Sequence, residues 1–301
     1  FLSVLYCSFL IGGSLTVGNL VQVNAFMSPF SHCHIALKIK GILSFAIPIV
    51  IIHSGGLKRF ANFMSCCIPL MGIIYIVICI VGISLLHHRL GFVLWEIFRN
   101  AINPHAAGGG SAGALFLAML QSGISRGLFA TDIGLGLAAI AHGNVQGRRI
   151  NRWIHAQQQG KIALVAPILV ATLCFMTGVL ILCAAPDFPQ TASQICIDTF
   201  VHTFHTPYAG WFIPVIIYCF ALTTILAWAW FAEHVFLFYN RIHWLRYYHF
   251  LSIAAIPAGA LIHSALPWHI ADICVCGLLL CNLYAIFSLR KVVEKIQNYK
   301  N

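Results

Sequence analysis

Amide side chains stand inside the first long apolar run of this 301-residue sequence. Asn19 and Gln22 are three residues apart, so in a helix they should share a face, whereas Asn24 should lie on another face. Amides without partners are costly away from water. Such groups either hydrogen-bond a bound polar molecule or hydrogen-bond a neighbouring helix, as is common in helix bundles. The residues alone leave both interpretations open.

Adjacent hydroxyls occur in a later apolar run, at Thr223 and Thr224, with Trp228 one helical turn beyond Thr224. Hydroxyl and carbonyl oxygens are the ligands that a hard cation prefers. The alternative is that each hydroxyl bonds back to a carbonyl of its own helix, which is ordinary for threonine. Trp228 would then be a packing residue.

A small-residue segment from Gly108 to Gly143 interrupts the apolar pattern. Non-helical backbone is tolerated in a bilayer only where it lines a cavity or packs against protein, so a glycine-interrupted span indicates a binding site. Gly110, Ser111 and Gly113 could present a helix N-terminus to a carboxylate. Close packing of small residues against another helix is the alternative.

Arg126 and Asp132 flank one end of the fourth expected span, and Glu233 and Asp272 are the other acidic residues near spans. A charge at the bilayer centre costs about 2.5–3.5 kcal/mol, so Arg126 and Asp132 should lie near the membrane interface. They would either pair at an inner gate or anchor the segment at the headgroups. Glu233 and Asp272 have no partner that the sequence identifies.

Histidines offer a different chemistry, that of an intramembrane enzyme or a metal site. His269 and Asp272 share a helix face, and His32-x-His34 or His202-x-x-His205 could begin a metal site. No third ligand and no HExxH pattern accompanies them. We therefore predict no catalytic residues, no enzyme activity, no cofactor and no metal other than sodium.

Composition defines the broad class of the protein. Hydrophobic residues make up 60% of the chain and charged residues 8%, against about 25% charged in a soluble domain. The net charge of +10 arises from residues between apolar runs, without the basic stripe of a nucleic-acid-binding surface. We predict an all-α polytopic membrane protein that binds no nucleic acid.

Apolar runs divide the chain, taken as a single transmembrane domain over 1–301, into eight expected spans. Their approximate ranges are 1–27, 35–53, 62–86, 107–129, 161–185, 209–239, 245–263 and 269–289. Of the 17 Lys and Arg residues, 13 fall in connections on one side and in the tail after Leu289. The positive-inside rule places these, and the C-terminus, in the cytoplasm.

The segment Arg126–Gly143, RGLFATDIGLGLAAIAHG, resembles a signature block of the alanine or glycine:cation symporter family, whose usual form is close to RGLFSNEAGLGSAPIAH. Shorter segments are similar to other family motifs, in the same order along the whole chain. They are Gly18–Asn24, Gly55–Arg59, Gly109–Ala114, Thr223–Trp228 and Trp268–Asp272. The overall character resembles a bacterial member, with a chlamydial one as a candidate.

The resemblance implies a fold of the leucine-transporter (LeuT) type, within the amino acid-polyamine-organocation superfamily, with two inverted repeats of five helices. The eight spans would be core helices 3 to 10, so that the chain is N-terminally truncated and does not transport alone. The implied function is sodium-driven symport of alanine, D-alanine or glycine across the bacterial inner membrane, by alternating access. A non-transporting membrane fragment and an intramembrane enzyme using His and Asp remain the alternatives.

The resemblance also implies roles for particular residues. The amino acid would bind at Gln22, Asn19, Gly110, Ser111, Gly113, Thr224 and Trp228. Sodium would bind at Thr223 and Thr224. The chain departs from the family pattern at Ala130–Gly134, where SNEAG is usual, and at Ser111, where phenylalanine is usual. These departures bear on the shape of the substrate pocket.

Overall fold

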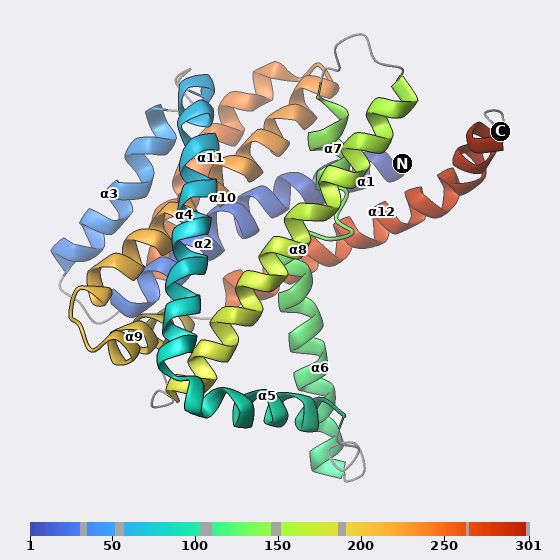
Figure 1. Ribbon diagram of the computed structural model, residues 1–301. Helices are drawn as coiled ribbons and strands as arrows, with labels where there is room; N and C mark the ends of the chain where they lie inside the picture. Colours follow the sequence, from blue (N-terminus) through green and yellow to red (C-terminus); the bar gives the residue numbers. More distant parts are fainter. Residues whose placement is uncertain are drawn as a thin grey trace.

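The structure is a computed structural model that describes residues 1–30, 35–51, 57–102, 110–145, 152–185, 191–262 and 265–298. These parts of the chain are helical, with no strand among them (Figure 1). The α-helices are α1 Leu2–Gly13, α2 Val21–Met27, α3 Ile35–Ile51, α4 Leu57–Leu85, α5 His87–Ile102, α6 Gly110–Thr131, α7 Leu137–Gly143, α8 Arg152–Ala184, α9 Ala192–Phe204, α10 Ala209–Phe238, α11 Ile242–Leu261 and α12 Leu266–Asn298.

Each of the eight expected spans overlaps a helix or a run of helices in the described residues, and the crossing of a membrane by all eight stays a prediction. Five described segments are long and apolar enough to cross a membrane: Leu2–Phe30, Ile68–Leu85, Ile154–Ala184, Ala209–Phe238 and Leu266–Val292. The structure therefore fits the predicted polytopic all-α membrane protein. Helices α3, α6 and α11 overlap the remaining three expected spans.

Three helices, α5, α7 and α9, lie where the sequence analysis expected connections. Helix α5 shows why a search for apolar runs misses such elements. Its apolar residues recur on one face, where Val93 and Ile97 pack with Val179 and Cys183 of α8, while charged residues interrupt the run. The sequence feature that indicates α5 is therefore the helical period of its apolar residues, and not the mean hydropathy of the segment.

The first span is a continuous helix with a wide turn in its middle. Between α1 and α2, the segment η1, Ser14–Leu20, is π-helical, and a short 3₁₀ turn, η2, Ser28–Phe30, ends the span. π-helical turns, with i→i+5 hydrogen bonds, are rare and frequent at functional sites. η1 packs against both α10 and α11, so it stands at the centre of the helix packing.

A sharp turn separates α6 from α7. Asp132, Gly134 and Gly136 have φ angles of 53°, 78° and 84°, the left-handed region that favours glycine. Two side chains from other helices hold the turn. The Tyr6 hydroxyl of α1 donates to the Leu135 carbonyl at 2.9 Å, and the Asn282 amide of α12 donates to the Gly134 carbonyl at 2.8 Å.

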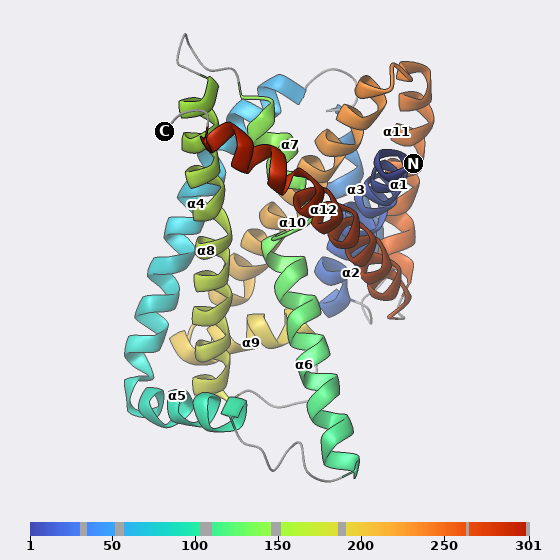
Figure 2. The ribbon, with the colours of Figure 1, turned by 90° about the vertical axis from the view of Figure 1, so that its right-hand side faces the viewer.

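The main core cluster lies where α1, η1, α10, α11 and α12 meet, around the buried Trp228. At one end of the molecule are α7, the start of α8, the end of α12 and the turn between α10 and α11 (Figure 2). Helix α5 and the start of α6 lie at the other end. The segments that carry most of the basic residues are thus at the same end, as the expected topology requires.

Candidate functional site

Trp228 occupies a socket formed by two glycines of the first span. Its side chain is 2% exposed. A Cβ atom added at Gly13 would lie 2.9 Å from Trp228 Cζ3, and one added at Gly18 would lie 2.8 Å from Trp228 Cβ. Residues five apart point about 140° apart in an α-helix of 3.6 residues per turn. The wide turn of η1 lets both glycines meet the same side chain.

The hydroxyls of Thr223 and Thr224 both donate to the Phe220 carbonyl, at 2.8 and 2.9 Å. This is the back-bonded arrangement that the sequence left open as an alternative. Each hydroxyl oxygen still has lone-pair capacity toward a cation. Their assignment to a sodium site therefore stays a prediction.

The amides of the first span differ from the expected arrangement. Asn19 donates to the backbone and side-chain oxygens of Ser252, at 2.9 and 2.7 Å, and Asn24 donates to the Ile262 carbonyl of the α11 C-cap at 2.6 Å. Gln22 instead turns back to the Val17 carbonyl of its own span at 3.2 Å. The prediction that Asn19 and Gln22 share a helix face, with Asn24 on another, was wrong. Asn19 and Asn24 both bond toward α11, because the π-helical turn changes the helical period.

The glycine-rich segment was expected to be broken from Gly109 to Ala114. Gly110 to Ala114 are instead helical, forming the first turns of α6, whereas Gly108 and Gly109 lie outside the described residues. Gly110, Ser111 and Gly113 thus stand at a helix N-terminus, as the sequence analysis proposed. Helix α6 packs mainly against α8 and α12, and a cavity shared by these residues with Gln22, Thr224 and Trp228 stays a prediction.

The guanidinium of Arg126 has a carboxylate partner on α12, not Asp132. Its Nη2 lies 2.9 Å from Asp272 Oδ2, and the ring of Trp268 lies 4.7 Å from the guanidinium carbon. The Ser125 hydroxyl donates to the other Asp272 oxygen at 3.0 Å. Of the two alternatives left open for Arg126 and Asp132, the one in which they pair with each other was wrong. Asp272, which had no assigned partner, joins α6 to α12 through this cluster.

Asp132 lies instead in the turn between α6 and α7, outside the five candidate spans. Burial without a compensating positive charge raises the pKa of its carboxyl to about 7. A carboxyl with such a pKa exchanges a proton in the physiological range.

A contact between an imidazole and a carboxyl group, missed by the sequence analysis, joins α10 and α11. His249 Nε2 is 3.0 Å from Glu233 Oε1. The buried hydroxyls of Ser14 and Ser252 and the phenol of Tyr248 lie in the same region. Single serines and a tyrosine in apolar runs give no pattern that predicts such a network from sequence.

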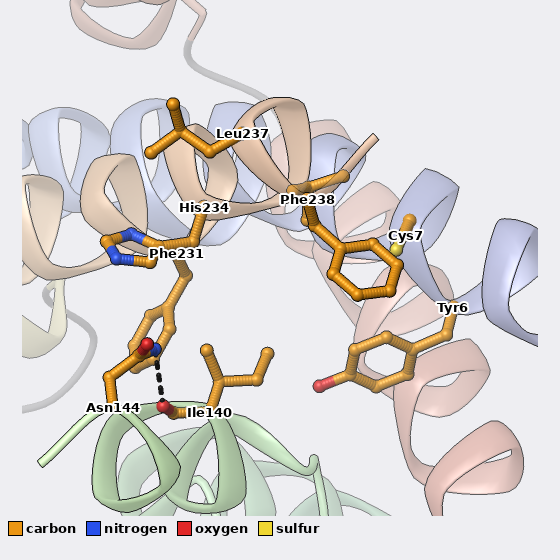
Figure 3. Close-up of a pocket in the computed structure, with 9 residues that line it drawn as sticks. Tyr6, Cys7, Ile140, Asn144, Phe231, His234, Leu237 and Phe238 are labelled. Carbon is orange, nitrogen blue, oxygen red and sulfur yellow. Dashed lines mark hydrogen bonds between the residues drawn. The ribbon is translucent and has the colours of Figure 1, made fainter. Parts of the chain in front are cut away.

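A cavity of about 360 Å³ opens between α1, α7 and α10 (Figure 3). Tyr6 and Cys7 line it from α1, and Phe231 and His234 line it from α10. Asn144, at the end of α7, lines the third side and donates to the Ile140 carbonyl at 2.9 Å. None of the residues assigned to substrate or sodium lines this cavity.

Among the described residues, no group of three His, Cys, Asp or Glu side chains converges as a metal site would require. His32 and His34 lie outside the described residues. Asp272 is engaged by Arg126, and His205 ends α9 with a φ of 48°.

These features define an integral membrane protein of several helices, with polar and ionic groups inside its helix packing. Comparison with known families makes the assignment specific. The sodium:alanine symporter family matches the chain over residues 1–301. The chain belongs to this family. Membership confirms the expectation that the protein is not an enzyme, because the family consists of symporters.

Similar proteins occur in bacteria and archaea. An uncharacterized transporter of Haemophilus influenzae is 32% identical over 289 residues, which cover 94% of this chain and 62% of that protein. The sodium/alanine symporter AgcS of Methanococcus maripaludis is 25% identical over 97% of this chain and 63% of its own length. The probable sodium/glutamine symporter GlnT of Bacillus subtilis is 26% identical, over 92% and 56%. The chain thus spans about three fifths of the length of these relatives.

Proposed function

We propose that the protein acts in sodium-driven symport of a small neutral amino acid, alanine or glycine, across the bacterial inner membrane. The observation that carries the proposal is the family match over the whole chain, together with a relative named as a sodium/alanine symporter. Because the chain covers only part of its relatives, the proposed transport is that of the full-length symporter, and residues 1–301 alone are expected not to transport. The competing interpretation is a membrane fragment without transport activity.

The proposed mechanism is alternating access in a fold of the leucine-transporter type, with the eight expected spans as core helices 3 to 10. Two features support it. The turn at 132–136 interrupts the path from α6 to α7, and η1 interrupts the α-helical geometry of the first span. Interrupted helices supply the backbone groups that bind substrates and ions in such carriers.

The proposed binding groups are neutral. Helix α10 presents Thr224 and Trp228 one turn apart, and Thr223 adjoins them. Gln22, Asn19 and the start of α6 at Gly110, Ser111 and Gly113 would complete the substrate site. Amides and helix ends suffice for a zwitterion, since its two charges can be met by oriented dipoles.

The test is uptake of labelled alanine in proteoliposomes, with an inward sodium gradient and with no gradient, by a version that spans the full length of its relatives and, for comparison, by residues 1–301, which we expect not to transport alone. We expect uptake only with the gradient, and competition by unlabelled glycine. Glutamine is the informative competitor, because one relative is named as a probable sodium/glutamine symporter. Absence of gradient-driven uptake of any of these amino acids would contradict the proposal.

A further inference from the structure

Helix α5 lies where two candidate membrane spans end, and the proposed transport site gives it no role. It begins two residues after the span Ile68–Leu85 of α4, and it packs against α8, whose span ends at Ala184. Figures 1 and 2 both show α5 running across these ends of α4 and α8. The layer next to the end of a hydrocarbon-spanning helix is that of the lipid headgroups, so α5 lies at headgroup level.

The outward face of α5 is aromatic. Phe92, Trp95 and Phe98 are each at least 60% exposed, whereas Val93 and Ile97 turn toward α8. Tryptophan and tyrosine are enriched where a membrane meets water, because one end of the ring is apolar and the other polar. An amphipathic helix with Trp, Phe or Leu on its apolar face lies in the plane of that interface. The exposed aromatic face therefore indicates contact with lipid.

A cavity of about 560 Å³ lies between α5 and the end of α8. Three polar side chains of α5 line it, those of Arg89, Glu96 and Asn100, and Leu182 and Ala185 line it at the end of α8. Because the α8 span ends beside Ala185, the cavity opens at headgroup level. None of the residues proposed to bind the amino acid or sodium lines it.

The cavity presents one positive and one negative side chain. Arg89 and Glu96 are seven residues apart, so they stand about 10.5 Å apart along one face of the helix. Arg89 Nη1 donates to the Cys183 carbonyl at 2.9 Å, which fixes the guanidinium and leaves most of its five N–H donors available. Glu96 makes no hydrogen bond or ion pair with another described residue. A ligand with an anion at one end and a cation at the other would match both groups.

We propose that this cavity binds the headgroup of a zwitterionic phospholipid, with the phosphate at Arg89 and a primary ammonium at Glu96. The planar guanidinium presents N–H groups in the geometry that phosphate oxygens accept. The Glu96 carboxylate accepts hydrogen bonds from the ammonium and repels a headgroup that carries only negative charge. Phe92 and Leu182 supply apolar wall for the glycerol and the first acyl carbons. This site is independent of the amino acid that the protein transports.

A free amino acid also carries an anion and a cation, but it matches the cavity less well. Its two charged groups are attached to a single carbon, whereas Arg89 and Glu96 are two helical turns apart. A phosphate and an ammonium joined by a two-carbon linker reach further between them. The position of the cavity at the end of a span and its apolar walls also favour a lipid.

The first measurement is lipid selectivity, and it needs no transport. The protein is released from detergent with equal amounts of phosphatidylethanolamine, phosphatidylcholine and phosphatidylglycerol of the same acyl chains, and native mass spectrometry reports which lipid stays bound. We expect phosphatidylethanolamine to be preferred about 2- to 5-fold, the range that an ion pair exposed to water gives. The quaternary ammonium of phosphatidylcholine has no N–H to donate, and phosphatidylglycerol has no cation. Equal retention of the three lipids would overturn the proposal.

Variants of α5 locate the site. Glu96→Gln should abolish the preference over phosphatidylglycerol, and Arg89→Gln should weaken retention of all three lipids. Arg99→Gln is the matched control, because Arg99 is exposed on the same helix and does not line the cavity. An unchanged preference in Glu96→Gln, or an equal effect of Arg99→Gln and Arg89→Gln, would contradict the assignment. If Arg89→Gln does not fold for want of its bond to Cys183, Glu96→Gln decides.

Competition with a small zwitterion separates a lipid site from a site for free amino acids. Excess free alanine should leave the retained phosphatidylethanolamine unchanged. Displacement of the lipid by alanine, lost in Glu96→Gln, would assign the cavity to amino acids and overturn the lipid proposal. A lipid preference that depends on Glu96 in a protein whose full-length version shows no uptake would support the lipid site and contradict the symporter.

Discussion

Threonine hydroxyls in α10 are the residues on which the proposed coupling to sodium depends most directly. Thr223→Val and Thr224→Val each remove one oxygen and keep the shape. An unmade polar contact in a buried site costs about 1–3 kcal/mol, so the sodium concentration for half-maximal uptake should rise about 5- to 150-fold. Sodium-dependent uptake curves of these variants in a full-length version measure this.

The back-bonding of both hydroxyls to the Phe220 carbonyl provides the contrasting expectation. If that bond is their whole function, the valine variants should melt at slightly different temperatures and keep the same sodium dependence. Thr172→Val is a suitable control, because Thr172 bonds back to Ile168 in the same way and is exposed on α8.

Asp132 predicts a pH dependence with a definite sign. Its pKa in the folded protein is raised to about 7 from an ordinary value near 3.8, so the folded state holds a proton that the unfolded chain releases. Stability should fall as the pH rises from about 4 to about 7 and stay low above that. Asp132→Asn should remove this loss and melt higher than the unmodified protein at pH 8.

The melting temperatures of both proteins, measured between pH 4 and pH 9, check this prediction. The two curves should converge at the acid end, where Asp132 is protonated in either state. A lower melting temperature for Asp132→Asn at pH 8 would show that the carboxylate is stabilised by a contact and not destabilised by burial.

At the scale of elements, the close packing of α10 against η1 depends on glycine residues. Gly18→Ala places a Cβ 2.8 Å from that of Trp228, too close for two rigid groups. Overpacking of this kind costs about 1–3 kcal/mol, so the variant should melt several degrees lower. Gly123→Ala is the matched control, since a Cβ there meets nothing within 4 Å and alanine favours the α6 helix.

The positions of most long helices could be predicted from sequence, because their apolar runs have the length that a bilayer requires. The run 209–239, for example, corresponds closely to α10. The π-helical geometry of η1 could not be predicted, because SLTVGNL has no feature that distinguishes it from an α-helical turn. That single irregularity accounts for the wrong assignment of faces to Asn19, Gln22 and Asn24.

For the candidate site, too, some features could be predicted from the sequence and others could not. Residue types indicated Thr224, Trp228 and Asn19 as polar or large groups in spans, and Trp228 and Asn19 are indeed buried at the helix interface. Pairing between distant residues was not predictable. Asp272 and Arg126 are 146 positions apart, and no local pattern relates two charges at that separation.

At the scale of the whole molecule, the distribution of basic residues predicts which end faces the cytoplasm. Of the 17 Lys and Arg residues, 13 belong to one set of connections, and such a bias sets orientation. Single cysteines introduced at 142–160 or after Leu289 should resist a membrane-impermeant thiol reagent in intact cells. A cysteine at Glu96 of α5 should react. The reverse pattern would invert the topology.

The wide turn of η1 also bears on which insertions and deletions the chain can accept. A π-helical turn accommodates one residue inserted into an α-helix, so the helical segments on either side keep the same faces toward their neighbours. Removing one residue from Ser14–Leu20 would let the first span close into continuous α-helix, with α1 and α2 still directed toward their neighbours. One residue removed from the middle of α10 would rotate everything beyond it by about 100°. Variation in length between homologous first spans should therefore concentrate at η1, and it would alter the glycine socket while leaving the rest of the bundle in register.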